Sequence, residues 1–278
     1  MNGKVGILHP GEMGSYVARS VRASVGSAFY CPAGRSAASI RRATEAGLDA
    51  LDSLQELVDS CSVLLSVCPP HAAMEQAKTI CSLGFRGCYV DANAVSPALM
   101  FEMDALLAKA GITLVDGGII GLPKPGGQAT LYLAGPGAAG LLPLFAKGPL
   151  EARVLGPNVG QASALKQCYA AWNKGRTALL AAVLAAAEQL DVRAALEGRW
   201  DEEEPGTAAA SHARLQFVAR KAWRFGGEMD EIAATFRELG IPAGFFEAAG
   251  TLYRRESDFK DLETPPGITA LLAALARS

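Results

Sequence analysis

The stretch that decides the fold lies at the start of the chain: Lys4-Val5-Gly6-Ile7-Leu8-His9-Pro10-Gly11-Glu12-Met13-Gly14. A short apolar strand here leads into a glycine turn and then into an amphipathic segment, which predicts a strand, a turn and a helix in succession. The helix expected from Met13 offers free backbone N–H groups and the positive end of its dipole. Gly11 and Gly14 allow phosphates and the neighbouring strand to approach closely. The stretch therefore predicts a pyrophosphate site, and hence a bound dinucleotide.

His9 occupies the position at which the full fingerprint Gly-x-Gly-x-x-Gly has its first glycine, so only the second and third glycines are kept. Two interpretations of His9 stay open. Either its imidazole lies beside the cofactor phosphates, or Pro10 and Gly11 close the turn alone. The incomplete motif needs support from the rest of the chain.

The composition is that of a globular protein of enzyme size. Half of the 278 residues are apolar, which provides a large core without metals or disulfides. A net charge of −2 with scattered Lys and Arg gives no reason to expect nucleic acid. The six cysteines form no Cys-x-x-Cys pair, so we expect no metal and a reducing compartment. Neither a signal peptide nor a membrane span is expected from the sequence, which favours a cytoplasmic protein.

Apolar strand-like runs alternate with helical patterns through the first half of the chain. We expect strands at Val5–Leu8, Ala28–Cys31, Val63–Val67, Cys88–Asp91 and Thr113–Asp116. The alternation indicates βαβ units, and nearly continuous apolar runs are typical of strands covered on both faces. We therefore predict an α/β fold with a Rossmann-type doubly wound parallel sheet. Short closing strands are expected at Gln128–Ala134 and Ala152–Leu155, after the Gly/Pro-rich stretch Gly117–Gly127.

The pattern changes near residue 156. From Gln161 to Gln189 the chain has no proline and is rich in Ala and Leu, which predicts one helix roughly 40 Å long. We expect a dinucleotide-binding domain over residues 1–155 and an all-α substrate and dimerisation domain over residues 156–278. Helix breaks are expected at Glu204-Pro205-Gly206, Gly226-Gly227, Gly240-Ile241-Pro242 and Thr264-Pro265-Pro266-Gly267. The long helix is apolar around most of its circumference, so we expect a homodimer that buries it, although burial within one chain would leave the same pattern.

Three further segments carry a resemblance to a known family: Asp91-Ala92-Asn93-Ala94-Val95-Ser96-Pro97, Asp116-Gly117-Gly118-Ile119-Ile120-Gly121 and Gly160-Gln161-Ala162-Ser163-Ala164-Leu165-Lys166. With them, nearly the whole chain resembles the β-hydroxyacid dehydrogenases, the group that contains 6-phosphogluconate and 3-hydroxyisobutyrate dehydrogenases. The segments are similar to the one that closes the family's dinucleotide domain, to a substrate loop and to the start of the helix with the catalytic lysine. The closest likeness is to the branch whose short C-terminal helical domain has no assigned function. The resemblance implies hydride transfer between a nicotinamide cofactor and a small hydroxy acid or its carbonyl.

The choice of cofactor depends on the end of the second predicted strand. NAD-preferring sites usually place Asp or Glu there for the ribose 2′-OH, whereas this strand ends Phe29-Tyr30-Cys31. Arg35 and Ser36 follow, and a guanidinium beside a hydroxyl suits a 2′-phosphate, so we predict NADP rather than NAD. A solvated Arg35 at a helix start is the alternative. The predicted cofactor-binding residues are Pro10, Gly11, Glu12, Met13, Gly14, Arg35, Ser36, Cys68, Pro69 and Asn93.

Reduction of a carbonyl needs a proton for the developing alkoxide, and the reverse reaction needs a base. Lys166 is the candidate for both, as the resemblance implies and as its place near the start of an apolar helix favours. The family's asparagine four residues later is Ala170 here. Asn173 lies on the same helix face and is the second predicted catalytic residue, which would orient the substrate.

The predicted substrate-binding residues are Ser96, Gly121 and Lys174. Ser96 matches the family's segment and also stands before a proline as a helix cap does, and both roles can coexist. Gly121 permits a backbone approach to an anion, with Lys124 nearby in the same loop. Lys174 would attract an acidic substrate, and a surface lysine is the equal alternative.

Two other functions stay open. An imine reductase of the same superfamily shares the architecture but generally lacks the catalytic lysine, so Lys166 counts against it. A non-catalytic NADP-binding sensor is suggested by His9, Ile120 and Ala170, which depart from the family's pattern. The sensor would bind the cofactor without turning over any hydroxy acid.

Overall fold

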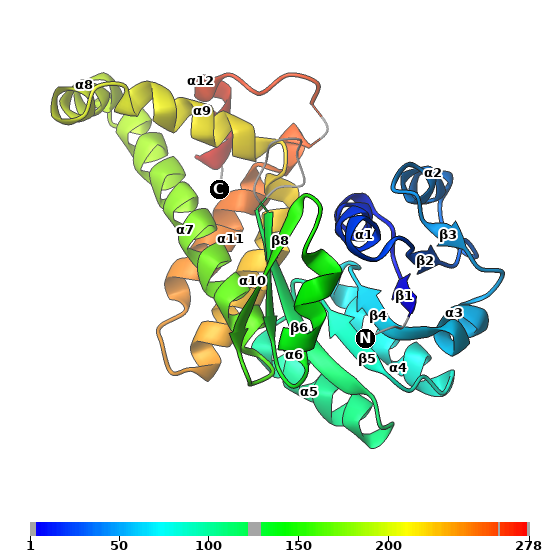
Figure 1. Ribbon diagram of the computed structural model, residues 1–278. Coiled ribbons are helices and arrows are strands. Elements are labelled where there is room, and N and C mark those ends of the chain that lie inside the picture. Colours follow the sequence, from blue (N-terminus) through cyan, green and yellow to red (C-terminus); the bar gives the residue numbers. More distant parts are fainter. Residues whose placement is uncertain (1–3, 122–128, 261, 277–278) are drawn as a thin grey trace. The chain divides into compact units, whose positions relative to one another are not determined.

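The computed structural model describes residues 4–121, 129–260 and 262–276, and the chain divides into two compact units, Met1–Gln167 and Cys168–Ser278. The described part of the first unit contains one sheet with the order β3-β2-β1-β4-β5-β6-β7-β8 (Figure 1). Its strands are β1 (Lys4–Ile7), β2 (Phe29–Tyr30), β3 (Asp49–Ala50), β4 (Cys61–Ser66), β5 (Cys88–Asp91), β6 (Thr113–Ile120), β7 (Ala129–Ala134) and β8 (Leu150–Gly156). Neighbouring strands are parallel except β6 and β7. The predicted mostly parallel sheet is therefore confirmed.

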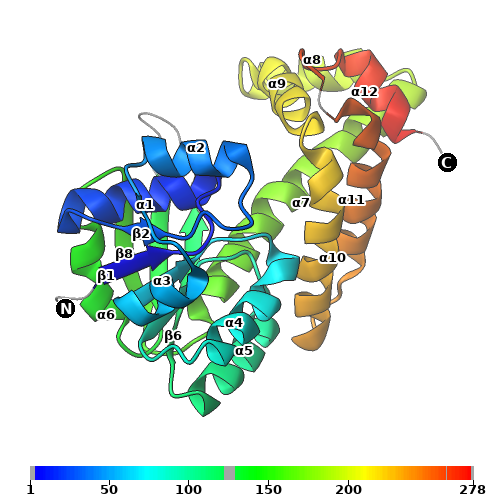
Figure 2. The same ribbon diagram turned by 90° about the vertical axis from the view of Figure 1, so that its right-hand side faces the viewer.

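Helices cover both faces of this sheet. They are α1 (Glu12–Val25), α2 (Ala37–Glu45), α3 (Leu54–Ser60), α4 (Ala73–Ser82), α5 (Pro97–Lys109) and α6 (Ala138–Leu141), with 3₁₀ turns η1 (Pro70–Ala72) and η2 (Leu142–Phe145). One buried cluster joins a sheet face to α1, α2, α6 and η2, and a second joins the other face to α3, α4 and α5. Figure 2 shows α1 and α2 on one side of the strands and α4 and α5 on the other. The nearly continuous apolar runs of the strands follow from this double burial.

Two features of the sheet differ from the prediction. The edge strand β3 was not expected, because its two residues, Asp49 and Ala50, carry no periodicity. β6 continues four residues beyond the predicted end at Asp116. A Cβ atom at Gly117 would lie 3.0 Å from the Asp91 carbonyl oxygen, and one at Gly118 would lie 2.7 Å from the Ala162 carbonyl oxygen. These glycines therefore belong to a tightly packed strand and not to a loop.

The second unit is helical over its described residues, as predicted. The long helix α7 (Gln161–Gln189) begins in the first unit and is followed by α8 (Arg193–Glu203), α9 (Thr207–Ala219), α10 (Ala222–Glu238), α11 (Gly244–Arg255), η3 (Ser257–Phe259) and α12 (Ile268–Leu275). One buried cluster joins α7 to α9 and α12, and another joins α7 to α10 and α11. β8 ends at Gly156, where the sequence pattern changes, but the first compact unit continues to Gln167.

Three of the four predicted helix breaks are confirmed, and the one at Gly226-Gly227 is wrong because both glycines lie inside α10. A Cβ atom at Gly226 would lie 2.8 Å from Cγ of Arg254, and one at Gly250 would lie 3.3 Å from the Gly226 carbonyl oxygen. These glycines allow α10 and α11 to pack closely. Within the described ranges, no helix is both long enough and apolar enough to cross a membrane.

Candidate functional site

A small cavity opens where the sequence predicted the pyrophosphate site. β1 ends at Ile7, and α1 begins at Glu12 with Gly11 as its N-cap residue. The cavity has a volume of about 180 Å³ and is lined by His9, Pro10, Gly11, Arg35, Ser39, Val67 and Pro69; we call it the turn cavity. It joins the segments that follow β1, β2 and β4, at the point where the strand order reverses. Ligands of open α/β sheets bind in this place.

The two glycines of the turn have different surroundings. A Cβ atom at Gly14 would lie 1.9 Å from the His9 carbonyl oxygen, so only glycine allows α1 to pack against the turn. A Cβ atom at Gly11 would meet no described atom within 4 Å. Gly14 therefore serves the packing of the fold, and Gly11 leaves open space beside the turn cavity.

Two buried nitrogen atoms of the turn cavity lack hydrogen-bond partners. They are Nδ1 of His9 and Nε of Arg35, neither of which has a partner among the described residues. Burial, and then the charge of Arg35, lower the pKa of His9 to about 4, so the imidazole is neutral at pH 7. Unpaired buried polar atoms are costly in a folded protein. The phosphate oxygens of a dinucleotide would accept hydrogen bonds from such donors, so the residues present fit this cofactor.

The predicted cofactor residues near the second strand divide between two places. Arg35 lines the turn cavity, whereas Ser36 is the N-cap of α2 and accepts a hydrogen bond from the Ser39 N–H at 3.2 Å. Ser39, which the sequence analysis missed, lines the turn cavity one turn later in the helix. Glu12 and Met13 form the first residues of α1. Contact of these residues with a cofactor stays a prediction.

Asn93 ties together two segments that follow neighbouring strands. Its Nδ2 donates to Oδ2 of Asp91 at 2.7 Å and to Oγ of Ser66 at 3.2 Å, while its Oδ1 accepts from the Cys68 N–H at 2.5 Å. Asn93 is buried and its amide is occupied within the protein. Burial raises the pKa of the Cys68 thiol. Asn93 thus positions the segment of Cys68 and Pro69, and Pro69 reaches the turn cavity.

A second buried carboxyl group fixes the start of α7. Asp91 and Asp116 are register partners on β5 and β6, and both are fully buried. Asp116 accepts hydrogen bonds from the N–H groups of Ala162 and Ser163 at 2.9 and 3.0 Å, and from Oγ of Ser163 at 2.7 Å. We call Asp91, Asn93, Asp116 and Ser163 the carboxylate cluster. It orients the first turn of the helix that carries Lys166.

Lys166 lies close to this cluster. A Cβ atom at Gly118 would lie 3.6 Å from Cβ of Lys166, so the side chain of Lys166 starts next to Gly118 of β6. Burial raises the pKa of Asp91 to about 7; hydrogen bonds from Asn93 oppose the rise, Asp116 adds to it, and the charge of Lys166 lowers it. Burial also raises the pKa of Asp116, against the hydrogen bonds that it accepts. The ammonium group of Lys166 is therefore within electrostatic reach of the buried Asp91 carboxyl group.

The predicted substrate residues of the first unit lie at element ends. Oγ of Ser96 accepts from the Leu99 N–H at 3.2 Å and caps α5, which confirms the helix-cap role. Gly121 follows β6 with φ of 112°, in the region that favours glycine. Lys124 lies outside the described residues.

In the second unit, Asn173 and Lys174 have partners of their own. Nδ2 of Asn173 donates to the Tyr169 carbonyl at 3.0 Å, and its Oδ1 accepts from Arg176 at 3.1 Å. Nζ of Lys174 lies 2.8 Å from Oε2 of Glu228, and the Lys174 side chain is 17% exposed. Lys174 is therefore not a solvated surface lysine, and its ammonium group already has an acidic partner. The substrate roles of both residues stay predictions.

Four polar residues of these two regions were not among the predicted site residues: Ser39, Ser66, Asp116 and Ser163. Ser66 ends β4, and Ser39 and Ser163 lie in the first turns of α2 and α7, so position beside a predicted loop is their signal; Asp116 lies inside β6 and carries no such signal. Among the residues with a described placement, no group of His, Cys, Asp and Glu side chains could hold a metal ion.

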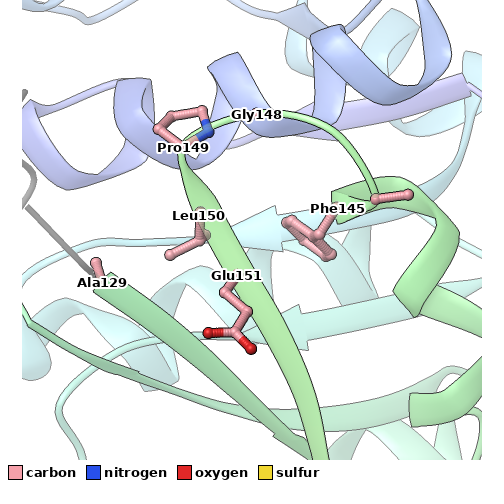
Figure 3. Close-up of a pocket in the computed structure, with 7 residues that line it drawn as sticks. Ala129, Phe145, Gly148, Pro149, Leu150 and Glu151 are labelled. Atoms are coloured by element: carbon pink, nitrogen blue, oxygen red, sulfur yellow. The ribbon is translucent and has the colours of Figure 1, made fainter. Parts of the chain in front are cut away.

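A larger cavity, of about 320 Å³, lies beside the start of β8 (Figure 3). It is lined by Ala129, Phe145, Ala146, Gly148, Pro149, Leu150 and Glu151. No predicted site residue lines it, and the Glu151 carboxylate is paired with Arg153 at 2.7 Å. The chemistry of the first unit therefore concentrates at the turn cavity and the carboxylate cluster.

The fold and these two regions define a dinucleotide-binding α/β unit joined to a helical unit, and solved structures share this arrangement. A conserved protein of unknown function, described as structurally similar to 3-hydroxyacid dehydrogenases, is 25% identical, with a TM-score of 0.73 over 92% of this chain and 98% of that chain. A 3-hydroxyisobutyrate dehydrogenase from Mycobacterium tuberculosis, solved with L-serine, is 16% identical, with a TM-score of 0.73 over 100% of both chains. A reductive aminase from Aspergillus terreus in complex with NADPH is 18% identical, with a TM-score of 0.55 over 98% of this chain and 99% of that chain.

Two sequence comparisons add to this. A domain of unknown function, DUF1932, matches residues 187–255. An uncharacterized 28.5 kDa protein from Methanothermus fervidus is 27% identical over 187 residues, which are 67% of this chain and 72% of that protein. The structural resemblance to the hydroxyacid dehydrogenases is thus confirmed, and the DUF1932 match lies within the helical part of the chain. These structures show that the chain shares its fold with hydroxyacid dehydrogenases and a reductive aminase.

Proposed function

We propose that this protein is an NADP-dependent oxidoreductase that transfers a hydride between NADP(H) and a small hydroxy acid or the corresponding carbonyl compound. The observation that carries the proposal is the placement of Lys166 in the first turns of a helix capped by buried Asp116, over the glycines of β6. The turn cavity, with its unpaired donors, supports the dinucleotide part.

When bound, the nicotinamide would supply or accept the hydride. Lys166 gives its proton to the carbonyl oxygen during reduction and takes the hydroxyl proton during oxidation. Asn173, seven residues later in α7, orients the substrate without transferring a proton, because an amide does not act as an acid. Ser96, Gly121 and Lys174 contact the acidic group of the substrate.

The cofactor residues have corresponding proposed roles. The turn from Pro10 to Gly14 binds the pyrophosphate through backbone N–H groups at the start of α1. Arg35 binds the 2′-phosphate, with Ser36 holding the start of α2 beside it. Cys68 and Pro69 flank the cofactor, and Asn93 positions them.

The test of the catalytic role is Lys166→Ala, assayed on a panel of hydroxy acids by the absorbance of the reduced nicotinamide. We expect kcat/KM to fall by about 10²–10⁴-fold because general acid–base catalysis contributes this much. NADPH binding should survive, since Lys166 lies on α7 and not in the turn cavity. The matched control is Lys78→Ala, a lysine 54% exposed and paired with Glu75, which should leave turnover unchanged. Unchanged turnover in Lys166→Ala would overturn the assignment.

The cofactor preference is tested by thermal unfolding with NADPH and with NADH. A ligand that binds only the folded state raises the melting temperature, so NADPH should stabilise the protein more than NADH does. Arg35→Ala should remove this difference. Stronger stabilisation by NADH would contradict the role of Arg35.

An imine reductase is the second candidate, and its supporting observation is the fold shared with the reductive aminase. The same assay panel therefore includes cyclic imines. Imine reduction that persists in Lys166→Ala, with no turnover of hydroxy acids by the wild type, would favour this candidate. NADPH binding without any turnover would favour the sensor.

The homodimer is a further part of the proposal, supported by an exposed stripe on α7. Six exposed positions of α7, and Leu190 directly after its end, alternate in steps of three and four, the spacing of a coiled-coil seam: Tyr169, Trp172, Arg176, Leu179, Val183, Ala186 and Leu190. Leu179 is 53% exposed and Leu190 is 70% exposed. The double substitution of Leu179 and Val183 by Glu should give a monomer in light scattering, while the exposed control Gln189→Glu should not. A cytoplasmic location completes the proposal and rests on the six free cysteines.

A further inference from the structure

His9 and Arg35 come from different segments and meet at one cavity. His9 follows β1 and Arg35 follows β2, and both line the turn cavity. Each has a buried nitrogen atom, Nδ1 of His9 and Nε of Arg35, without a hydrogen-bond partner among the described residues. These two nitrogen atoms therefore make no hydrogen bond to each other, although the charge of Arg35 acts on the His9 pKa. The arrangement thus presents two separate donors to one space.

The other residues that line the turn cavity carry no charge. They are Pro10, Gly11, Ser39, Val67 and Pro69. Arg35 also takes part in no ion pair within the described ranges. An anion that enters this cavity would therefore gain the guanidinium without displacing a carboxylate.

We propose that His9 is a second residue of the 2′-phosphate site, and that its imidazole and the Arg35 guanidinium bind the same phosphate group. This inference rests on the proposed NADP preference. A phosphate monoester carries a charge of about −1.5 to −2 at pH 7 and offers three strong acceptor oxygens. The neutral imidazole donates one N–H, the guanidinium donates its Nε–H, and the Ser39 hydroxyl lies in the same lining. In this proposal, the residue at the first glycine position of the fingerprint, His9, binds the phosphate group.

Phosphate binding beside His9 should change the protonation of its imidazole. The free imidazole is neutral at pH 7, because burial and Arg35 lower the pKa of His9 to about 4. The charged group that faces His9 across the cavity is Arg35, and Glu12, the first residue of α1, is exposed. A bound phosphate favours the imidazolium ion and raises the pKa of His9. Binding of NADPH should therefore take up protons through His9 between the lowered pKa of about 4 and the ordinary imidazole value of 6.5.

The experiment compares wild type, His9→Gly and His9→Gln by isothermal titration with NADPH, NADH and the probe adenosine 2′,5′-bisphosphate. His9→Gly restores the fingerprint residue and should weaken NADPH and the probe about tenfold, while NADH changes by less than twofold. Thermal unfolding of each variant without ligand checks that the fold is intact. Equal weakening of NADPH and NADH, or no weakening of either, would overturn the inference.

The proton uptake is measured by titrating NADPH at pH 6.5 in two buffers of different ionisation enthalpy. His9→Gln keeps a polar side chain but cannot titrate, so the uptake in wild type should exceed that in His9→Gln. Equal uptake would overturn the inference. A wild type that binds NADH as tightly as NADPH would contradict the proposed NADP preference, whereas a preference for NADPH that is as strong in His9→Gly as in wild type would contradict only the role of His9.

Discussion

The turn cavity and the carboxylate cluster both lie at the carboxyl ends of parallel strands, but their buried polar atoms are satisfied in different ways. In the turn cavity, Nδ1 of His9 and Nε of Arg35 have no described partner. In the carboxylate cluster, Asp116 accepts three hydrogen bonds and Asn93 makes bonds to three residues. Because an unpaired buried polar atom costs free energy, the proposed cofactor would complete the first region, whereas the second region is satisfied within the protein. The turn cavity thus contains residues proposed to bind the cofactor, whereas the carboxylate cluster contains residues that position the start of α7.

The largest expected effect is in Gly14→Ala, which tests whether part of the turn serves packing alone. The new Cβ atom would lie 1.9 Å from the His9 carbonyl oxygen, so the helix or the turn must move. We expect a loss of about 3 kcal/mol in the free energy of unfolding, at the upper end for an overpacked site. Urea denaturation measures it. Wild-type stability in this variant would contradict the close contact between α1 and the turn.

The next effect concerns the carboxylate cluster, in Asp116→Ala. This change leaves the N–H groups of Ala162 and Ser163 and the Ser163 hydroxyl without their acceptor. We expect a loss of about 2–3 kcal/mol in the free energy of unfolding, and lower turnover because the start of the Lys166 helix is released.

Asp116→Asn is the matched control, since its carbonyl oxygen still accepts hydrogen bonds, and it should lose less stability than Asp116→Ala. NADPH affinity should stay within about twofold of wild type in both variants. A large loss of NADPH affinity with normal stability would show that the cluster binds the cofactor, and the comparison would fail.

A more gradual effect appears in the pH dependence of stability. The pKa of Asp91 is raised to about 7 in the folded protein from an ordinary value of 3.8. A raised folded pKa means that the stabilisation is fully present below about pH 4 and is lost as the pH rises through 7. A pKa difference of one corresponds to about 1.4 kcal/mol, so a difference of about three gives an upper limit of about 4 kcal/mol for the decline.

Asp91→Asn has no carboxyl group to titrate at this position, so its stability should fall less between pH 4 and 7 than that of wild type. Urea denaturation at several pH values gives the difference curve, in which the other titrating groups largely cancel. Parallel curves for the two proteins would contradict the raised pKa of Asp91.

The sequence predicts the local features of both regions better than their long-range contacts. Alternating apolar runs predict the sheet, and the segments around Gly11 and Lys166 predict the places proposed for the cofactor and for catalysis. The bond from Asp116 to Ser163 spans 47 residues, so no local pattern contains it. Glycines are ambiguous in the same way, because a glycine can break a helix or allow two helices to pack closely. In the sequence Gly226 is typical of a helix break, and only its closeness to Arg254 shows that it serves packing. The packing of distant segments is not contained in any local pattern. It decides whether a polar or small residue binds a ligand, caps a helix or packs against another element.

The smallest effect on stability, and the sharpest test of the comparison, is Gly11→Ala. Gly11 has φ of −72°, which alanine adopts without strain, and its Cβ atom would meet no described atom within 4 Å. Because alanine reduces the entropy of the unfolded chain, stability should stay equal or rise by about 0.4–1 kcal/mol. The same methyl group would stand where the pyrophosphate approaches, so NADPH and NADH should both bind about tenfold more weakly. Gly14→Ala would then lower the free energy of unfolding, whereas Gly11→Ala would lower the affinity for the cofactor. The same change of glycine to alanine would thus have different effects at two positions three residues apart. If Gly11→Ala instead unfolds the protein or binds NADPH normally, the open space beside Gly11 does not receive the cofactor.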